Sequence, residues 1–113
     1  GFNVDQTAAT IVGENIFFNV TMNFESENCI YSLVMVNEDG SMSSVGLKDG
    51  YKNLNNLPLL YSFKADDLPS GNASFSLYRI GSSSEVICMW SYNQETKTIE
   101  TQNINASLSE ATE

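Results

Sequence analysis

The stretch of sequence that decides the fold is residues 16–24, Ile-Phe-Phe-Asn-Val-Thr-Met-Asn-Phe. Apolar side chains occupy every second position from Ile16 onward, and polar ones such as Asn19 and Thr21 lie between them. A period of two is typical of a β-strand that buries one face, because a helix brings every third or fourth residue to the same side. We therefore expect an all-β protein.

Strand-like segments continue along the rest of the chain. They cover residues 4–12, 15–24, 29–36, 41–47, 58–65, 73–80, 85–92 and 96–101. Turn signals separate them at the spacing of roughly 8–12 residues that sandwiches and small barrels have. One such signal is Asp39-Gly40, which predicts a hairpin. We expect an immunoglobulin-like antiparallel β-sandwich of about seven strands, with its two sheets packed face to face.

Two of these segments make specific predictions about their faces. Residues 29–36 are apolar on both sides, which predicts a central strand covered at least in part on each face. In residues 85–92, the side chains of Val86, Cys88, Trp90 and Tyr92 share one face. We therefore expect Trp90 to pack in the core rather than to form a binding platform.

The composition is that of one small domain with an acidic surface. The chain has 113 residues, of which 42 % are hydrophobic, and this is enough to fill one core. We assign residues 1–101 to a single sandwich domain and residues 102–113 to an acidic polar tail. The net charge of −9 excludes nucleic acid as an expected partner, because phosphate binding requires a clustered basic surface. No apolar run approaches the roughly 20 residues of a membrane span.

The groups that usually carry catalysis are scarce. The chain contains no histidine, the commonest general base and metal ligand. Asn37, Glu38, Asp39 and Ser41 offer oxygen ligands for calcium, but they match a turn better than a twelve-residue calcium loop. We expect no enzyme activity, no cofactor and no metal-binding residue.

The two cysteines, Cys29 and Cys88, both fall in strand-like segments. A disulfide between them would close a loop of roughly 60 residues and stabilise the fold by about 4 kcal/mol in the chain-entropy model. We name this pair as the disulfide candidate, and two buried thiols are the alternative. Two thiols without a histidine do not complete the four ligands of a zinc site.

Three Asn-X-Ser/Thr triplets begin at Asn19, Asn72 and Asn105. In a secreted eukaryotic chain these asparagines would be glycosylation acceptors. A chain this rich in Asn, Ser and Thr produces about as many triplets by chance, so they do not identify the type of organism.

A contact surface is expected around the longest irregular stretch of the chain, residues 48–57. Tyr51 and Lys52 lie in this stretch, and Tyr61 lies in the strand that follows it. We predict these three residues as contact residues, because binding side chains concentrate on loops held by a rigid scaffold.

The order of these signals resembles a known class of domain. A Gly-Glu turn precedes an alternating strand in residues 12–16, an apolar strand leads into Asp-Gly in 31–40, and a Leu-Pro-Ser-Gly-Asn loop leads into a strand in 67–78. This order is similar to that of the immunoglobulin-like accessory domains of bacterial, especially Bacteroidetes-type, secreted and cell-surface proteins. The resemblance implies a sandwich fold and an extracellular location, and it carries over no functional residues. The chain differs from antibody domains, because no tryptophan lies between its cysteines.

The resulting hypothesis is a non-catalytic extracellular or cell-surface module for protein contact, adhesion or spacing, with a protein or glycan partner. The chain opens without a signal peptide, and we expect it to be part of a longer protein. The alternative is a carrier that holds a lipid or another small apolar ligand between its sheets. A glycine-led strand in residues 71–80, followed by a turn and Cys88, resembles secreted lipid-recognition sandwiches, and this resemblance implies the carrier role. Its expected lining residues are Phe17, Phe24, Phe63 and Phe75.

Overall fold

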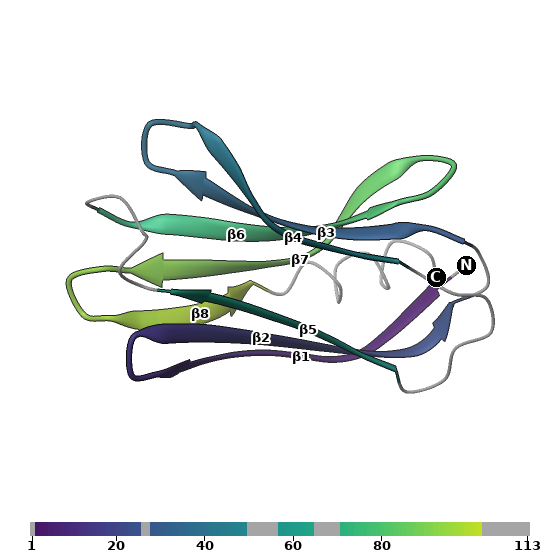
Figure 1. Ribbon diagram of the computed structural model, residues 1–113, viewed down its shortest axis with the longest axis horizontal. Coiled ribbons are helices and arrows are strands. Elements are labelled where there is room, and N and C mark those ends of the chain that lie inside the picture. Colours follow the sequence, from purple (N-terminus) through teal and green to yellow (C-terminus); the bar gives the residue numbers. More distant parts are fainter. Residues whose placement is uncertain (1, 26–27, 50–56, 65–70, 103–113) are drawn as a thin grey trace.

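The computed structural model describes residues 2–25, 28–49, 57–64 and 71–102, and most of them lie in β-strands (Figure 1). The strands are β1 (Phe2–Val12), β2 (Asn15–Glu25), β3 (Ile30–Asn37), β4 (Met42–Asp49), β5 (Leu57–Lys64), β6 (Ala73–Ile80), β7 (Ser84–Asn93) and β8 (Thr98–Gln102). No helix occurs within these ranges, so the all-β prediction is confirmed. Gln102 closes β8, and the remainder of the predicted tail lies outside the described residues.

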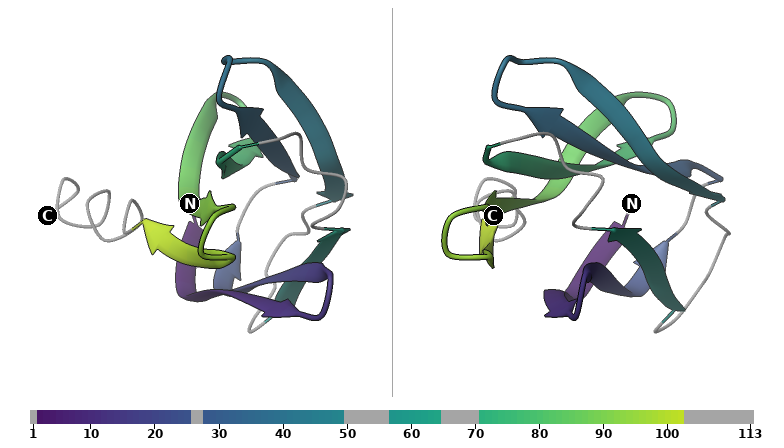
Figure 2. Two further views of the ribbon diagram at one scale, coloured as in Figure 1. Left: turned by 90° about the vertical axis from the view of Figure 1, so that its left-hand side faces the viewer. Right: turned by 60° about the vertical axis from the view of Figure 1, so that its left-hand side comes forward.

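The strands form two antiparallel sheets. One has the order β1-β2-β5 and the other has the order β4-β3-β6-β7-β8. The chain thus places its first, second and fifth strands in one sheet and its third, fourth, sixth and seventh in the other, as immunoglobulin-like sandwiches do. The predicted fold class is confirmed, and β8 is an added strand at the edge. Figure 2 shows the two layers from the side, with β4 near β5 on one flank and β8 near β1 on the other.

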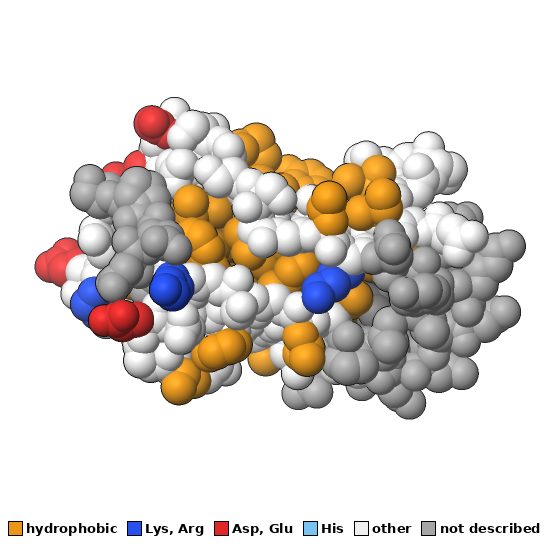
Figure 3. Space-filling view, in the orientation of Figure 1, with side chains coloured by type: hydrophobic (Ala, Val, Ile, Leu, Met, Phe, Trp, Pro, Cys, Tyr) orange, Lys and Arg blue, Asp and Glu red, His pale blue; other side chains and the backbone are white. Residues whose placement is uncertain are grey.

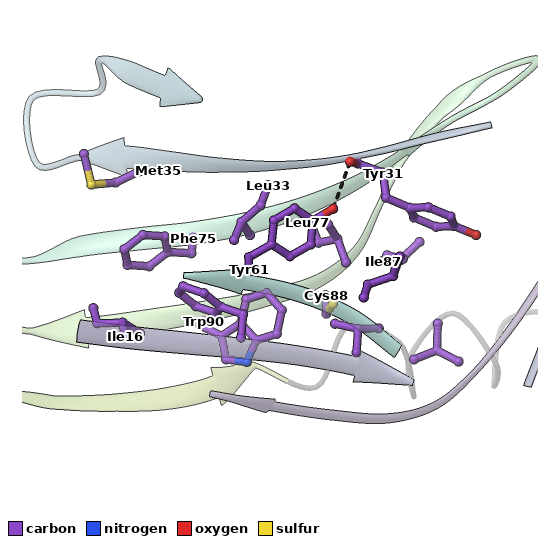
Figure 4. Packing of buried hydrophobic residues seen from close by; sticks show 14 of the residues in the cluster. Ile16, Tyr31, Leu33, Met35, Tyr61, Phe75, Leu77, Ile87, Cys88 and Trp90 are labelled. Atoms are coloured by element: carbon purple, nitrogen blue, oxygen red, sulfur yellow. Dashed lines mark hydrogen bonds between the residues drawn. The ribbon is translucent and has the colours of Figure 1, made fainter. Parts of the chain in front are cut away.

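The core fills the space between the sheets with alternate residues of each strand. Ile16, Phe18 and Val20 of β2 are at most 1 % exposed, which confirms that the alternating stretch in residues 16–24 buries one face. Phe75 of β6 and Trp90 of β7 face them from the other sheet, and both are fully buried (Figure 4). The ring centroid of Phe18 lies 4.9 Å from those of both residues. Trp90 is therefore a core residue, as predicted.

A β-bulge in β7 changes which residues face the core. Leu77 pairs with Cys88, but its neighbour Tyr78 pairs with Val86, so Ile87 is an extra residue without a partner of its own. Because the bulge shifts the alternation, Ile87 is fully buried and Val86 is only half-buried. The prediction that Val86 shares the buried face of the later residues of β7 is wrong.

The disulfide candidate is also wrong: Cys29 and Cys88 are two separate buried thiols. The register explains this result. Cys88 of β7 pairs with Leu77 of β6, and Leu77 pairs with Leu33 of β3. Cys88 is therefore level with Leu33, two strands across the sheet, and Leu33 is four residues along the chain from Cys29. These offsets are about 10 Å across the sheet and about 13 Å along it. A disulfide requires Cα atoms within roughly 7 Å, so this fold keeps the two thiols apart.

Candidate functional site

The outer face of the five-stranded sheet, meaning the side chains of β3, β4, β6 and β7 that point away from the core, contains three rows of uncharged residues. One row consists of Leu47, Ser32, Tyr78 and Val86. The next row consists of Ser44, Val34, Ser76 and Met89. A third row consists of Met42, Val36, Ser74 and Ser91, and it continues onto Glu100 of β8. Cross-strand neighbours lie about 5 Å apart, so these rows form one continuous surface.

Large apolar side chains remain exposed on this face. Leu47 is 64 % exposed and Met42 is 56 % exposed, while Ile30 and Ile80, which pair with each other, are 40 % and 39 % exposed. Val34 beside them is half-buried. β3 lies between β4 and β6, and its outer side is partly covered, so the prediction of a central strand covered at least in part on each face is confirmed.

The charged side chains described on these strands lie on the other series of positions. Lys48 and Arg79 both pair with Tyr31, whose side chain is buried, and Glu85 pairs with Arg79. A weak ion pair joins the Arg79 guanidinium to the Glu85 carboxylate at 3.8 Å. These three charged side chains thus lie off the three uncharged rows, whereas Asp49 pairs with Ile30 in the neighbouring row.

The outer side of the three-stranded sheet differs in its pattern. It exposes Val12, Phe17 and Leu60 by 57 %, 44 % and 56 %. Each of these pairs with polar residues, as Leu60 does with Asn19. Its apolar residues are therefore interspersed with polar ones, as they are on an ordinary protein surface.

A pocket of about 380 Å³ lies at one end of the outer face. The β3–β4 turn, the start of β6, the end of β7 and the start of β8 surround it. Val36, Ser74, Ser91 and Glu100 of the third row line it, and Glu38 lines it from the turn. Polar and apolar groups contribute about equally to its wall. In Figure 3, the visible acidic side chains gather at the end of the molecule that carries these turns, while hydrophobic ones lie across the middle.

A hydrogen-bond network joins the loops at this end pocket. The Glu38 carboxylate accepts a hydrogen bond from the Asn72 backbone N–H at 2.8 Å. The Gln94 backbone N–H donates to the Asn72 side-chain oxygen at 2.9 Å, and the Gly71 N–H donates to the Gln94 side chain at 2.6 Å. Gly71 has a φ of +117°, and a Cβ there would lie 2.5 Å from a Glu38 oxygen. Glycine is therefore required at the point where Glu38 docks.

The β3–β4 turn is held by its own side chains. The Asp39 carboxylate accepts hydrogen bonds from the backbone N–H and the hydroxyl of Ser41, at 2.9 Å and 2.6 Å. These two bonds lower the pKa of the Asp39 carboxyl group. The side-chain NH₂ of Asn37 donates to the Ser41 hydroxyl at 2.8 Å, and the buried side-chain oxygen of Asn37 has no hydrogen-bond partner. The residues considered for calcium thus form the predicted turn, and no group of three potential metal-ligating side chains converges within the described ranges.

Of the three predicted contact residues, Tyr61 is the one that lies within the described part of the chain. Tyr51 and Lys52 lie outside the described residues. Tyr61 is only 6 % exposed, and its hydroxyl donates a hydrogen bond of 2.9 Å to the Tyr31 carbonyl in the opposite sheet (Figure 4). Its ring packs against Gly46, where a Cβ would lie 3.2 Å away. Tyr61 is therefore part of the core and is not a contact residue.

Of the three sequons, two can be placed. Asn19 is exposed on the outer side of the three-stranded sheet, so its side chain is accessible. Asn72 is exposed as well, but its side-chain oxygen is bonded to Gln94 in the rim of the end pocket. Asn105 lies outside the described residues. Glycosylation of these residues stays a prediction.

Three of the four phenylalanines expected to line a lipid cavity can be placed, and Phe17 lies apart from Phe63 and Phe75. Phe17 points outward and is 44 % exposed, whereas Phe75 is fully buried. Phe63 packs its ring against Phe75, with centroids 5.7 Å apart. The side chain of Phe24 is not among those described. Side chains thus occupy the space around Phe75 that the lipid alternative would need.

The outer face and the end pocket are the features that sequence reasoning missed. The signal for the outer face was present in residues 29–36, whose second side is also apolar. Comparison with known proteins found no matching family model, no matching curated protein and no matching solved structure. None of the described segments forms a helix long and apolar enough to cross a membrane.

Proposed function

We propose that this chain is a non-catalytic protein-contact module that binds its partner through the outer face of the five-stranded sheet. The observation that carries the proposal is the exposure of Leu47 and Met42 in three rows that hold no charge until Glu100. Exposed Ile30 and Ile80 lie in the row next to them, where Asp49 pairs with Ile30. Contiguous apolar patches depleted of charge and containing methionine and tyrosine are typical of the centre of a protein–protein interface.

Charge indicates which kind of partner fits. Two copies of this chain would each bring a charge of −9, and their mutual repulsion disfavours self-association at ordinary ionic strength. A partner with a basic rim around an apolar centre would instead be attracted. We therefore assign the outer face to a different protein and not to a second copy.

The test uses two variants matched in residue type. Leu47→Asp places a charge in the outer face, and Leu60→Asp places the same charge at a similarly exposed leucine of the other sheet. The purified chain and both variants are immobilised, and proteins captured from extracts and culture medium of the source organism are compared by mass spectrometry. We expect the wild type and Leu60→Asp to capture the same protein, and Leu47→Asp to lose it. Equal capture by both variants, or loss only with Leu60→Asp, would refute the proposal.

A further inference from the structure

We propose that the end pocket receives a cationic side chain, arginine or lysine, of the protein that binds the outer face. The inference rests on the proposed function and names the feature of the partner that the pocket selects. The pocket adjoins the outer face, because Val36, Ser74 and Ser91 belong both to the third row of that face and to the pocket lining. A partner seated on this face therefore extends over the mouth of the pocket.

The lining of the pocket is complementary to a positive charge. It contains two carboxylates, Glu38 and Glu100, and no lysine or arginine. Lys97 is next to Thr98 in the chain, but it is not among the lining residues. Ser74 adds a hydroxyl acceptor between the carboxylates, and the Ser91 hydroxyl beside it already accepts a hydrogen bond from the Gln102 side chain at 3.0 Å. A guanidinium or ammonium group consists only of donors, so its chemistry matches a wall that is rich in acceptors.

The Glu38 carboxylate is held in place before any ligand binds. The turn and the loop before β6 are locked together, since Glu38 accepts from the Asn72 N–H while Gly71 leaves room for its carboxylate. That bond uses one oxygen of Glu38. The half-buried Val36 supplies an apolar wall, against which the methylene stem of arginine or lysine can pack. A volume of about 380 Å³ admits such a side chain without displacing the loops.

The experiment uses small probes, so it does not depend on knowing the partner. N-acetyl-argininamide and N-acetyl-lysinamide are titrated into the ¹⁵N-labelled chain, and backbone amide shifts are followed by NMR. N-acetyl-citrullinamide is the neutral control, because it has nearly the shape of the arginine probe without its charge. We expect saturable shifts at the amides of Asn72, Ser74 and Ser91 with the cationic probes only, and a loss of binding as salt is raised.

Three variants assign the binding to the pocket. Glu38→Gln keeps an oxygen for the Asn72 N–H and removes only charge, and Glu100→Gln removes the charge on the opposite wall. Glu14→Gln, at an exposed glutamate in the turn between β1 and β2 that is not among the pocket-lining residues, is the matched control. We expect each pocket variant to weaken the arginine probe about tenfold and the control to leave it unchanged.

Two results would overturn the inference. One is equal binding of the citrulline probe, and the other is the absence of saturable shifts at the pocket amides. If capture of a protein still depended on Leu47 in either case, the proposed function would stand and only the assignment of the pocket would fail. If the arginine probe bound while capture did not depend on Leu47, the proposed function would fail instead.

Discussion

Replacing Tyr61 with phenylalanine tests how the two sheets are joined. The hydroxyl of Tyr61 in the three-stranded sheet donates to the Tyr31 carbonyl in the five-stranded sheet at 2.9 Å, within the protein interior. Phenylalanine keeps the ring and its contact with Gly46, so no large cavity forms and only the hydroxyl is lost. The change therefore isolates one bond between the layers.

The expected loss in the free energy of unfolding is about 1 kcal/mol at neutral pH, the net contribution of a typical buried hydrogen bond. For a domain of this size, such a loss lowers the unfolding temperature by about 4 °C. Burial, followed by the effect of the Cys88 thiolate, raises the pKa of Tyr61 above its usual value of 10. The folded wild type therefore keeps a proton that the unfolded chain releases above pH 10, and its stability falls by roughly 1 kcal/mol per pH unit there. The variant lacks this hydroxyl group, so the difference in the free energy of unfolding between wild type and Tyr61→Phe must shrink as the pH rises above 10.

The assay is urea unfolding followed by the fluorescence of Trp90, the only tryptophan in the chain and a fully buried one. Tyr78→Phe is the control, because Tyr78 is a half-exposed residue on the outer face. Equal midpoints for wild type and Tyr61→Phe at pH 7, or a gap that widens above pH 10, would contradict the reasoning.

Two further changes probe the end pocket and the buried thiol. Gly71→Ala must strain a backbone at φ +117° and displace Glu38, so we expect it to lower the free energy of unfolding by about 2 kcal/mol. Gly40→Ala, at φ +89° with no atom within 4 Å of the added Cβ, should lower it less. Chemical unfolding of both variants gives the comparison, and equal losses would speak against a role for Glu38. Burial raises the pKa of Cys88 to about 12, so stability present below pH 9 should decline from pH 9 upward as the unfolded chain releases the thiol proton. Cys88→Ala should flatten this decline between pH 9 and pH 10 in urea midpoints, and an unchanged slope would exclude the thiol as its source.

Local periodicity predicted the strands well, since each reads as alternation between two turn signals. Periodicity gave the wrong buried face where consecutive apolar residues allow either side of the strand to face the core. Val86, Ile87 and Cys88 are three consecutive apolar residues, and only the pairing with β6 shows that Ile87 is the bulged one. For Tyr61 the signal was available, because Tyr61 shares its face with Leu59 and Phe63, and alternation alone would have placed it inside.

The end pocket was beyond the reach of the sequence for a different reason. Glu38 follows β3, whereas Glu100 lies in β8, and only the order of strands in the sheet brings them to one end. Such juxtapositions depend on long-range register, which a local hydrophobic pattern does not contain. The same limit explains the disulfide error, because spacing in the chain does not show how far apart Cys29 and Cys88 lie in the sheet.

The arrangement of the edge strands has a consequence for aggregation at high protein concentration. The border strand β4 contacts β5 of the opposite layer, and β1 contacts β8. A foreign strand that tried to lengthen either sheet would collide with the neighbouring layer, and Pro58 in β5 offers it no N–H to pair with. The molecule thus blocks the route by which β proteins most readily polymerise into fibrils.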